Sequence, residues 1–449
     1  MTPDNLERVT QKLLDEAKLM GANEADVIAT EGQSISVDVR QGSLENADRA
    51  EGVEVGLRVL VSNRQAIVSS SNISDDTLKI MVERAIAMAK DAPKDRYAGL
   101  ASEDQLAKER NLSSLEICDV APEPSPLKLK EEAKKVEFSA LEVSGISQVS
   151  GASASYGKYS VFMAASNGFT AMYDRSSYSV SCVAIAGEGS DMERDYDADT
   201  RVHQSDLRPS EEIGRTAGMR AVERLKPRRP VTGDYPVLYD ERVSSSLIGH
   251  FLSAINGAAV ARGSSWLKNS LSKQVMPTSC KLVEDPHRLR SGVSRLFDAE
   301  GLPTKKREIV SDGVLNGWTL DLSSARKLGM DSTANASRGV SSNPSPSNWN
   351  IELSSPKDYC DNLLSEMKNG LIVTSLIGST INPNTGDYSR GASGFWVEDG
   401  QICYPVSEIT IAGNLKDILK GIVLGNDARR HLSFVVPSIL VESMTLAGS

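Results

Sequence analysis

An order of elements that occurs twice constrains this fold most: amphipathic helix, alternating strands, amphipathic helix. Apolar residues recur at three- and four-residue spacing over 3–20, which predicts a helix. Ser34–Val39 and, more strongly, Gly52–Val61 alternate with period two, as strands do. An apolar stripe from about Asp75 predicts a closing helix. Because short joins favour antiparallel pairing, we expect residues 1–95 to form an N-terminal α/β domain with a hairpin sheet.

The second occurrence follows a proline-rich linker that ends at Pro126. The pattern predicts a helix over 127–141, then strands from Ser144 to about Ala186, and a closing helix over 209–225. We therefore expect residues 120–226 to form a central α/β domain whose order of elements resembles that of the first.

Two prolines and three cations in Lys226–Pro230 mark the next boundary, because such a segment fits poorly inside a packed element. Residues 231–449 are rich in Ser, Gly and Asn. They contain a clear early helix over 241–256, helices near 357–369 and 414–424, and many short strands. The expected fold class is α+β: two N-terminal α/β units with hairpin-rich sheets, then a larger, mainly β C-terminal domain with flanking helices.

Charge and hydropathy exclude several function classes. The chain has 50 Lys+Arg against 60 Asp+Glu, a net charge of −10, which argues against nucleic acid as a partner. No apolar run is long enough for a membrane-spanning helix, so no membrane partner is expected. The first residues lack the apolar core of a signal peptide, which favours a cytoplasmic location. The five cysteines are scattered and odd in number, as in proteins of a reducing compartment.

The helix over 241–256 carries the most informative polar face. Its apolar residues form one stripe, while Ser246, His250 and Ser253 share the opposite side. Ser246 and His250 are four residues apart, so a Ser–His dyad is sterically conceivable. No carboxylate between residues 242 and 256 could orient the imidazole, and a hydrogen-bonded or solvated histidine is therefore the favoured interpretation.

Several segments of the C-terminal region, taken in order, resemble the TldD/PmbA family, and the last fits its PmbA (TldE) branch. They are Leu247–Leu267, Asn335–Arg338, Gly386–Gly400, Pro405–Asn414 and Val436–Gly448. The resemblance implies a heteromeric, zinc-dependent protease of the cytosol that processes peptide-antibiotic precursors and antitoxins, with the old label modulator of DNA gyrase. It implies that the TldD branch carries a His-Glu-x-x-x-His helix, an acidic residue soon after it and a distant cysteine.

Placed on that helix by the resemblance, this chain departs from the metal motif. Ser245 stands at the first His, Ser246 at the Glu, and Ser253 at the later acid, while His250 keeps the second His. The segment Asn426–His431 occupies the region of the ligand cysteine. A hydrolytic zinc needs three protein ligands, and its water needs a carboxylate base. The implied site is therefore degenerate: no catalytic, metal-binding or cofactor-binding residue is expected here, and zinc is expected in the partner subunit.

The resemblance thus implies a non-metal subunit whose partners are a TldD-like catalytic subunit and an extended peptide substrate. In isolation the chain could form a homodimer. Two alternatives remain open: a self-sufficient, weak peptidase using Ser246 and His250, or a peptide-binding module without a proteolytic partner. All four tryptophans follow residue 231, so we expect this C-terminal part to supply most of the partner contact.

Other polar features are expected to have structural roles. They are a tight turn at Gly391–Gly394, exposed loop carboxylates at Asp321 and Asp331, a buried thiol at Cys403 and a solvated basic rim at Arg429–His431. A further stretch, 332–347, is low in apolar residues and is expected to be a long surface loop.

Overall fold

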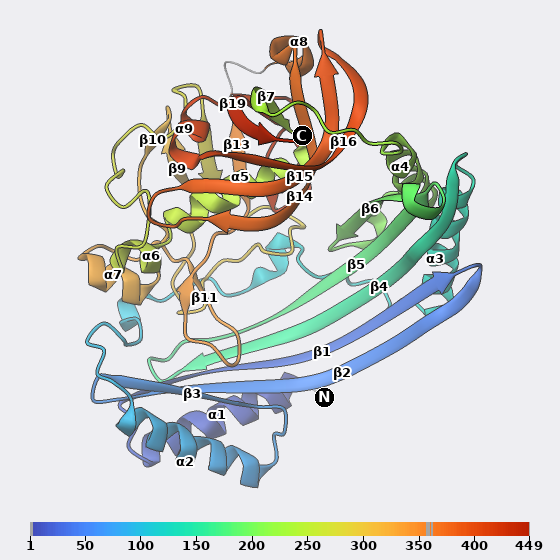
Figure 1. Cartoon of the computed structure of the whole chain (residues 1–449). Helices are drawn as coiled ribbons and strands as arrows, with labels where there is room; N and C mark the ends of the chain where they lie inside the picture. Colours follow the sequence, from blue (N-terminus) through green and yellow to red (C-terminus); the bar gives the residue numbers. More distant parts are fainter. Residues whose placement is uncertain (1–2, 356–359, 361, 449) are drawn as a thin grey trace.

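The N-terminal half of the chain forms one long, curved antiparallel sheet in the order β3-β2-β1-β4-β5-β6 (Figure 1). The computed structural model describes residues 3–355, 360 and 362–448. The six strands are β1 (Glu24–Arg40), β2 (Ser43–Val61), β3 (Arg64–Ser70), β4 (Ile146–Ala165), β5 (Thr170–Ala186) and β6 (Glu193–Arg201).

This sheet joins strands that the sequence analysis places in two separate units. β1 pairs with β4 from Asp26 opposite Ala165 to Val39 opposite Ala152. Period-two alternation reveals each strand but not its partner, because pairing depends on contacts more than 100 residues apart. The first two helix–strand–helix units thus share one sheet, within the α+β class that was expected.

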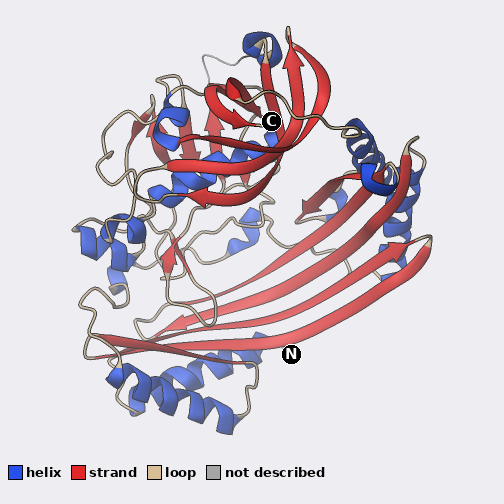
Figure 2. Ribbon diagram, viewed as in Figure 1, coloured by secondary structure: helices blue, strands red, loops and turns tan. Residues whose placement is uncertain are grey.

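Two helix pairs cover one face of this sheet at its two ends (Figure 2). The pairs are α1 (Pro3–Leu19) with α2 (Asp75–Asp91), and α3 (Pro126–Leu141) with α4 (Ser210–Glu223). Val27 of β1 packs in the first core and Ile35 in the second. Alternate side chains of a strand share a face, and these two positions are eight apart, so both helix pairs lie on the same side. All four helices match the sequence prediction.

The C-terminal region is built on five strands that close on themselves. β16 pairs with β15 on one side and with β19 on the other, and β14 and β7 complete the ring. Closure removes the free edges that an open sheet would expose. The strands are β7 (Gly233–Tyr239), β14 (Gly370–Ile381), β15 (Asp387–Glu398), β16 (Gln401–Asn414) and β19 (Ile439–Ala447), with β17 (Val423–Leu424) added on β19.

The remaining elements surround this closed sheet. A second sheet has the order β10-β9-β8-β13-β18, and a small hairpin joins β11 to β12. Its strands are β8 (Lys281–Glu284), β9 (Arg307–Ser311), β10 (Val314–Leu315), β13 (Ile351–Ser354) and β18 (Phe434–Val435); the hairpin is β11 (Ala336–Ser337) and β12 (Ser345–Pro346). The helices are α5 (Glu241–Ala254), α6 (Gly257–Ala261), α7 (Leu322–Leu328), α8 (Leu363–Met367) and α9 (Leu415–Lys420).

The early helix of this region is confirmed as α5, and the expected helix at 414–424 is the shorter α9. The helix expected near 357–369 lies partly outside the described residues, and α8 is its described part. None of the helices in the part of the chain that the structure describes is long and apolar enough to cross a membrane.

Three structural expectations are wrong. Gly391–Gly394 lies inside β15 rather than in a tight turn, and a Cβ at Gly394 would overlap the Ile372 carbonyl oxygen of β14. Cys403 is exposed on β16, not buried. The stretch 332–347 is not simply a surface loop, because Ala336 in it is fully buried and Arg338 binds Asp26 of β1.

Close approach of α3 and α4 depends on Gly214. A Cβ at this position would overlap the Val136 carbonyl oxygen of α3. We expect Gly214→Ala to destabilise the protein by about 1–3 kcal/mol, because overpacking forces the helices apart. Gly249→Ala in α5 is the matched control, since no atom outside its own helix lies within 4 Å of the added Cβ. That change should stabilise by about 0.5–1 kcal/mol. Urea unfolding of both variants measures the difference; equal effects would contradict it.

Candidate functional site

Helix α5 positions the candidate residues by burying its other face. Asp240 caps the helix by accepting a hydrogen bond from the Arg242 amide at 3.0 Å. Leu247, Ile248 and Phe251 are fully buried in the C-terminal core. Because these residues fix the rotation of the helix, the polar stripe with Ser246, His250 and Ser253 lies on the opposite side, as the sequence predicts. Ser245 belongs to the same helix and is half-buried.

The serine hydroxyls of this stripe are bound to the helix itself. Ser246 Oγ donates to the Val243 carbonyl at 2.7 Å, and Ser253 Oγ donates to the Gly249 carbonyl at 2.9 Å. Such bonds to carbonyls three or four residues back are common for serine in helices. A nucleophilic serine needs its hydroxyl hydrogen bonded to the base, so this geometry does not support the Ser246–His250 dyad.

His250 lies against two residues of β15 that come from far along the chain. Its ring packs edge-on to Tyr388 with centroids 5.9 Å apart. His250 Nε2 and Arg390 Nε are both buried, and neither has a hydrogen-bond partner among the residues that the structure describes. Burial, reinforced by the positive charge of Arg390, lowers the pKa of His250, so the imidazole is neutral at pH 7.

The lowered pKa of His250 makes a pH-dependent contribution to stability. Unfolding restores the ordinary value of 6.5, so below about pH 6.5 the unfolded chain binds a proton that the folded chain resists. Stability should therefore fall as the pH drops from 7 to 5, and His250→Gln should make that fall shallower. Thermal midpoints at both pH values test this. His431, whose pKa is also lowered, remains in both proteins and cancels in the comparison. Identical slopes would contradict the assignment.

The donor set around α5 does not fit the zinc that the resemblance implies for the other branch. The stripe offers one imidazole, and serine hydroxyls that already donate to carbonyls are poor ligands. Nowhere in residues 3–355, 360 and 362–448 do three or more His, Cys, Asp or Glu side chains form a group that could hold a metal ion. Absence of metal from the chain itself stays a prediction.

The segment Arg429–His431 is not simply a solvated rim. Arg429 binds both carboxylate oxygens of Glu241 at the start of α5, at 2.6 and 2.5 Å. His431 Nε2 lies 3.6 Å from Asp199 of β6, while Arg430 is largely exposed. Arg429 and His431 therefore place this segment between α5 and the N-terminal sheet.

Sequence analysis missed a row of buried aspartates on β6. Asp195 binds Arg224, which caps the end of α4, at 3.3 Å and Arg242 of α5 at 3.1 Å, so one carboxylate joins the sheet to the C-terminal region. The row consists of Asp195, Asp197 and Asp199. Their period-two spacing could have revealed the row from the sequence, because it places three acids on one face of a strand.

Asp321 also differs from expectation. It is 3% exposed and caps α7 by accepting from the Ser324 amide at 2.8 Å, whereas Asp331 is exposed as predicted.

The four tryptophans, Trp266, Trp318, Trp349 and Trp396, are all buried in the C-terminal region. They therefore cannot serve as the exposed anchors that the sequence analysis considered for partner contact.

Comparison with known proteins covers the same three parts of the chain. The domains of the PmbA/TldA metallopeptidase family match in order: domain 1 at residues 25–89, the central domain at 119–225 and the C-terminal domain at 232–448. Metalloprotease PmbA of Escherichia coli O157:H7 is 38% identical over 428 residues, which cover 94% of this chain and 92% of that protein.

Solved structures share the whole fold. One from Bacteroides thetaiotaomicron, described as a candidate modulator of DNA gyrase, has a TM-score of 0.90 and 27% identity, and the match covers 100% of both chains. TldE from Thermococcus kodakarensis has a TM-score of 0.83 over 98% of this chain and 99% of that one; at 19% identity this shows the fold alone. On the matches to all three domains and to a full-length relative, the chain belongs to the PmbA/TldA metallopeptidase family, as its PmbA-type (TldE) segments indicate.

Proposed function

We propose that this chain is the non-metal subunit of a heteromeric TldD/TldE-type zinc metalloprotease that degrades or processes unfolded peptides, such as antibiotic precursors and antitoxins. The observation that supports this best is the polar stripe of α5. By the resemblance, α5 corresponds to the family's active-site helix, but it presents one imidazole and two serines, Ser246 and Ser253, whose hydroxyls are bound to the carbonyls of Val243 and Gly249. A hydrolytic zinc site needs more ligands and a carboxylate base.

The role we propose for the chain is to bind a TldD-like catalytic subunit and help enclose an extended peptide. The sheet face opposite the helix pairs supports this role. Ser36, Ser155 and Ser179 are cross-strand neighbours on that face, and all three are half-buried. Small polar side chains leave room for a backbone and offer hydrogen bonds without selecting a particular side chain. Such a wall suits substrates recognised by their extended shape.

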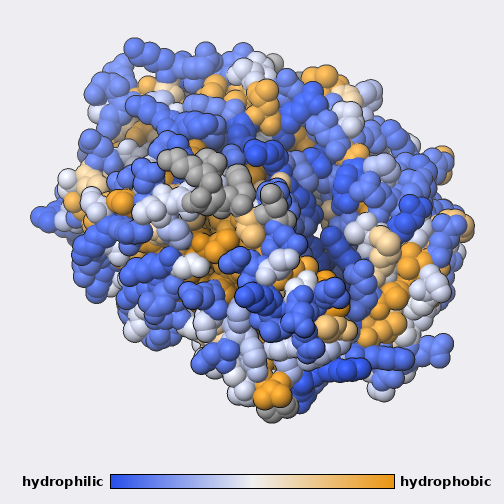
Figure 3. All heavy atoms as spheres, turned by 90° about the horizontal axis from the view of Figure 1, so that it is seen from above, coloured by the Kyte–Doolittle hydropathy of each residue, from blue (hydrophilic) through white to orange (hydrophobic). Residues whose placement is uncertain are grey.

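One face of the molecule shows how apolar residues are distributed on it. On the face in Figure 3, hydrophilic residues predominate and apolar residues form small, separate patches. With the tryptophans buried, we infer that docking does not use them as anchors.

Co-expression with the TldD-like protein of the same organism tests the assembly. We expect the two chains to co-purify, sedimentation to give a mass above that of either chain alone, and zinc to track the amount of the partner. The chain purified alone should hold no stoichiometric zinc. Failure to associate would favour a peptide-binding module that acts without a proteolytic partner, and stoichiometric zinc in this chain alone would contradict the non-metal role.

A further inference from the structure

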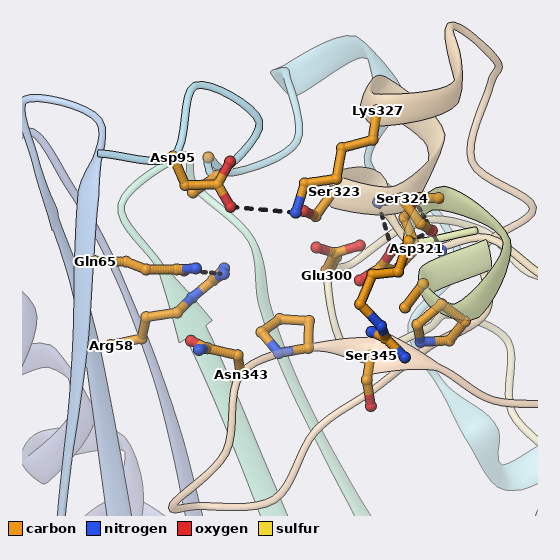
Figure 4. Close-up of a pocket in the computed structure, with 17 residues that line it drawn as sticks. Arg58, Gln65, Asp95, Glu300, Asp321, Ser323, Ser324, Lys327, Asn343 and Ser345 are labelled. Atoms are coloured by element: carbon orange, nitrogen blue, oxygen red, sulfur yellow. Dashed lines mark hydrogen bonds and ion pairs between the residues drawn. The ribbon is translucent and has the colours of Figure 1, made fainter. Parts of the chain in front are cut away.

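A cavity with several charged side chains in its lining, none of them from α5, lies between the long sheet and the C-terminal region (Figure 4). Its volume is about 250 Å³. β2 and β3 supply one wall through Arg58 and Gln65, and the C-terminal region supplies the facing wall through Glu300, Asp321 and neighbouring residues. Pockets for drug-sized ligands typically measure roughly 300–1,000 Å³, so this one suits a smaller molecule.

Two carboxyl groups lie in the C-terminal wall of the cavity, which Arg262 and Lys327 also line. Glu300 Oε2 accepts a hydrogen bond from the Leu322 amide at 2.8 Å, and Asp321 Oδ1 is bound by Ser324. Each group thus has one oxygen fixed by the protein, and in Figure 4 both carboxyl groups lie at the cavity. Desolvation, together with the negative charges of Asp298 and Asp321, raises the pKa of Glu300 to about 8 although Arg58 opposes the shift.

The facing wall carries a fixed positive charge. Arg58 is 3% exposed, and its Nε donates to Asp26 of β1 at 2.8 Å. Its Nη1 makes a long contact of 3.5 Å with Gln65 and lies on the cavity side. At the rim, Lys327 of α7 is held by Asp95 at 3.4 Å. Arg58 therefore faces the carboxyl groups of Glu300 and Asp321 across a space that the protein does not fill, and Arg262, beside α6, lines the same space.

We propose that this cavity binds a small zwitterion with an α-ammonium group and a carboxylate, an amino acid or a dipeptide, with the ammonium at Glu300 and Asp321 and the carboxylate toward Arg58. Charged groups removed from water are stabilised only when each meets an opposite charge. The two walls provide those charges in a space too small for a longer peptide. The site uses none of the residues of α5 and does not depend on the proposed function.

Binding of the ammonium group should change the protonation of Glu300, and this change can be measured. At pH 7 the carboxyl of Glu300 is mostly protonated, since its pKa is about 8. An ammonium bound beside it favours the carboxylate, so the proton leaves to solvent and the bound pair is neutral. The other charged groups around this carboxyl are Asp298, Asp321 and Arg58; Arg262 also lines the cavity, and Lys327 and Asp95 are paired at its rim. Binding should therefore release up to one proton.

Isothermal titration of the full chain alone with Ala-Ala, at pH 7 in two buffers of different ionisation enthalpy, tests the proposal. We expect saturable binding with proton release. N-acetyl-Ala-Ala should not bind, and Ala-Ala-amide should bind at least tenfold more weakly. No binding of Ala-Ala up to 10 mM, equal binding of the acetylated peptide, or binding without proton release would overturn the proposal.

Glu300→Gln is the decisive variant, because its amide oxygen can still accept from Leu322. We expect at least tenfold weaker binding and loss of the proton release. Glu83→Gln, an exposed change on α2, is the control and should bind as the wild type does. Unchanged binding by a folded Glu300→Gln protein would overturn the site; if this variant does not fold, the peptide series on the wild type decides. Because no partner is present, these results are separate from the test of assembly.

Discussion

Alone, the chain is expected to leave an unstructured peptide uncleaved, whereas addition of the TldD-like partner should raise the cleavage rate at least a hundredfold. The physical reason lies in α5. Ser246 and Ser253 donate to the carbonyls of Val243 and Gly249. His250 is neutral and half-buried, and within the described part of the chain no carboxylate is bound to its ring to make it a base. A fluorescence-quenched peptide of low complexity provides the assay.

Two comparisons sharpen this result. A chelator should abolish cleavage by the mixture but leave the thermal midpoint of this chain alone unchanged. His250→Ala should retain the activity of the mixture within a few-fold, since the change removes at most a ring contact with Tyr388. Chelator-sensitive cleavage by the purified chain would refute the proposed role. A hundredfold loss with a folded His250→Ala protein would reveal a catalytic contribution from that residue.

The helices could be predicted because their information is local. Apolar spacing alone located α1, α2, α3, α4 and α5, since each buries one stripe against a sheet. The pairing of β1 with β4 could not be predicted in this way. Val27 and Ile35 lie on one face of β1, yet they pack under different helix pairs, and only the folded sheet shows that the two pairs belong to one layer.

The candidate site likewise has a part that local sequence predicts and a part that depends on distant segments of the chain. The polar stripe of α5 follows from helical periodicity, so Ser246, His250 and Ser253 could be grouped from sequence. The surroundings of His250 could not, because Tyr388 and Arg390 come from a strand about 140 residues later. Asp195 is similar: its alternation with Asp197 was visible, but its bond to Arg242 of α5 depends on how the two halves of the protein pack.

Glu284→Gln is expected to destabilise the C-terminal region by about 3 kcal/mol, because it removes the charge of a buried carboxylate that pairs with the partly buried Arg307 and accepts from further donors. Glu284 is 1% exposed, and its Oε2 binds Arg307 Nε at 2.5 Å. Its Oε1 accepts from the Trp349 amide at 2.6 Å and from Asn335 at 2.9 Å. A glutamine amide oxygen can serve only one of these two sets, so either the guanidinium or the amide donors lose their acceptor.

Glu308→Gln on the adjacent strand β9 is the matched control. Glu308 is exposed and pairs with Lys281 at the surface, where ion pairs contribute little, so this variant should unfold almost as the wild type does. Scanning calorimetry should show the Glu284→Gln transition lowered by on the order of 10 °C. The double variant Glu284→Gln, Arg307→Met should recover part of that loss, because it removes the unpaired cation but not the unmet donors of Trp349 and Asn335. If Glu284→Gln is as stable as the control, solvent compensates the charge of Arg307. If the double variant is no more stable than Glu284→Gln, the loss of stability comes from the unmet backbone and amide donors and not from the charge.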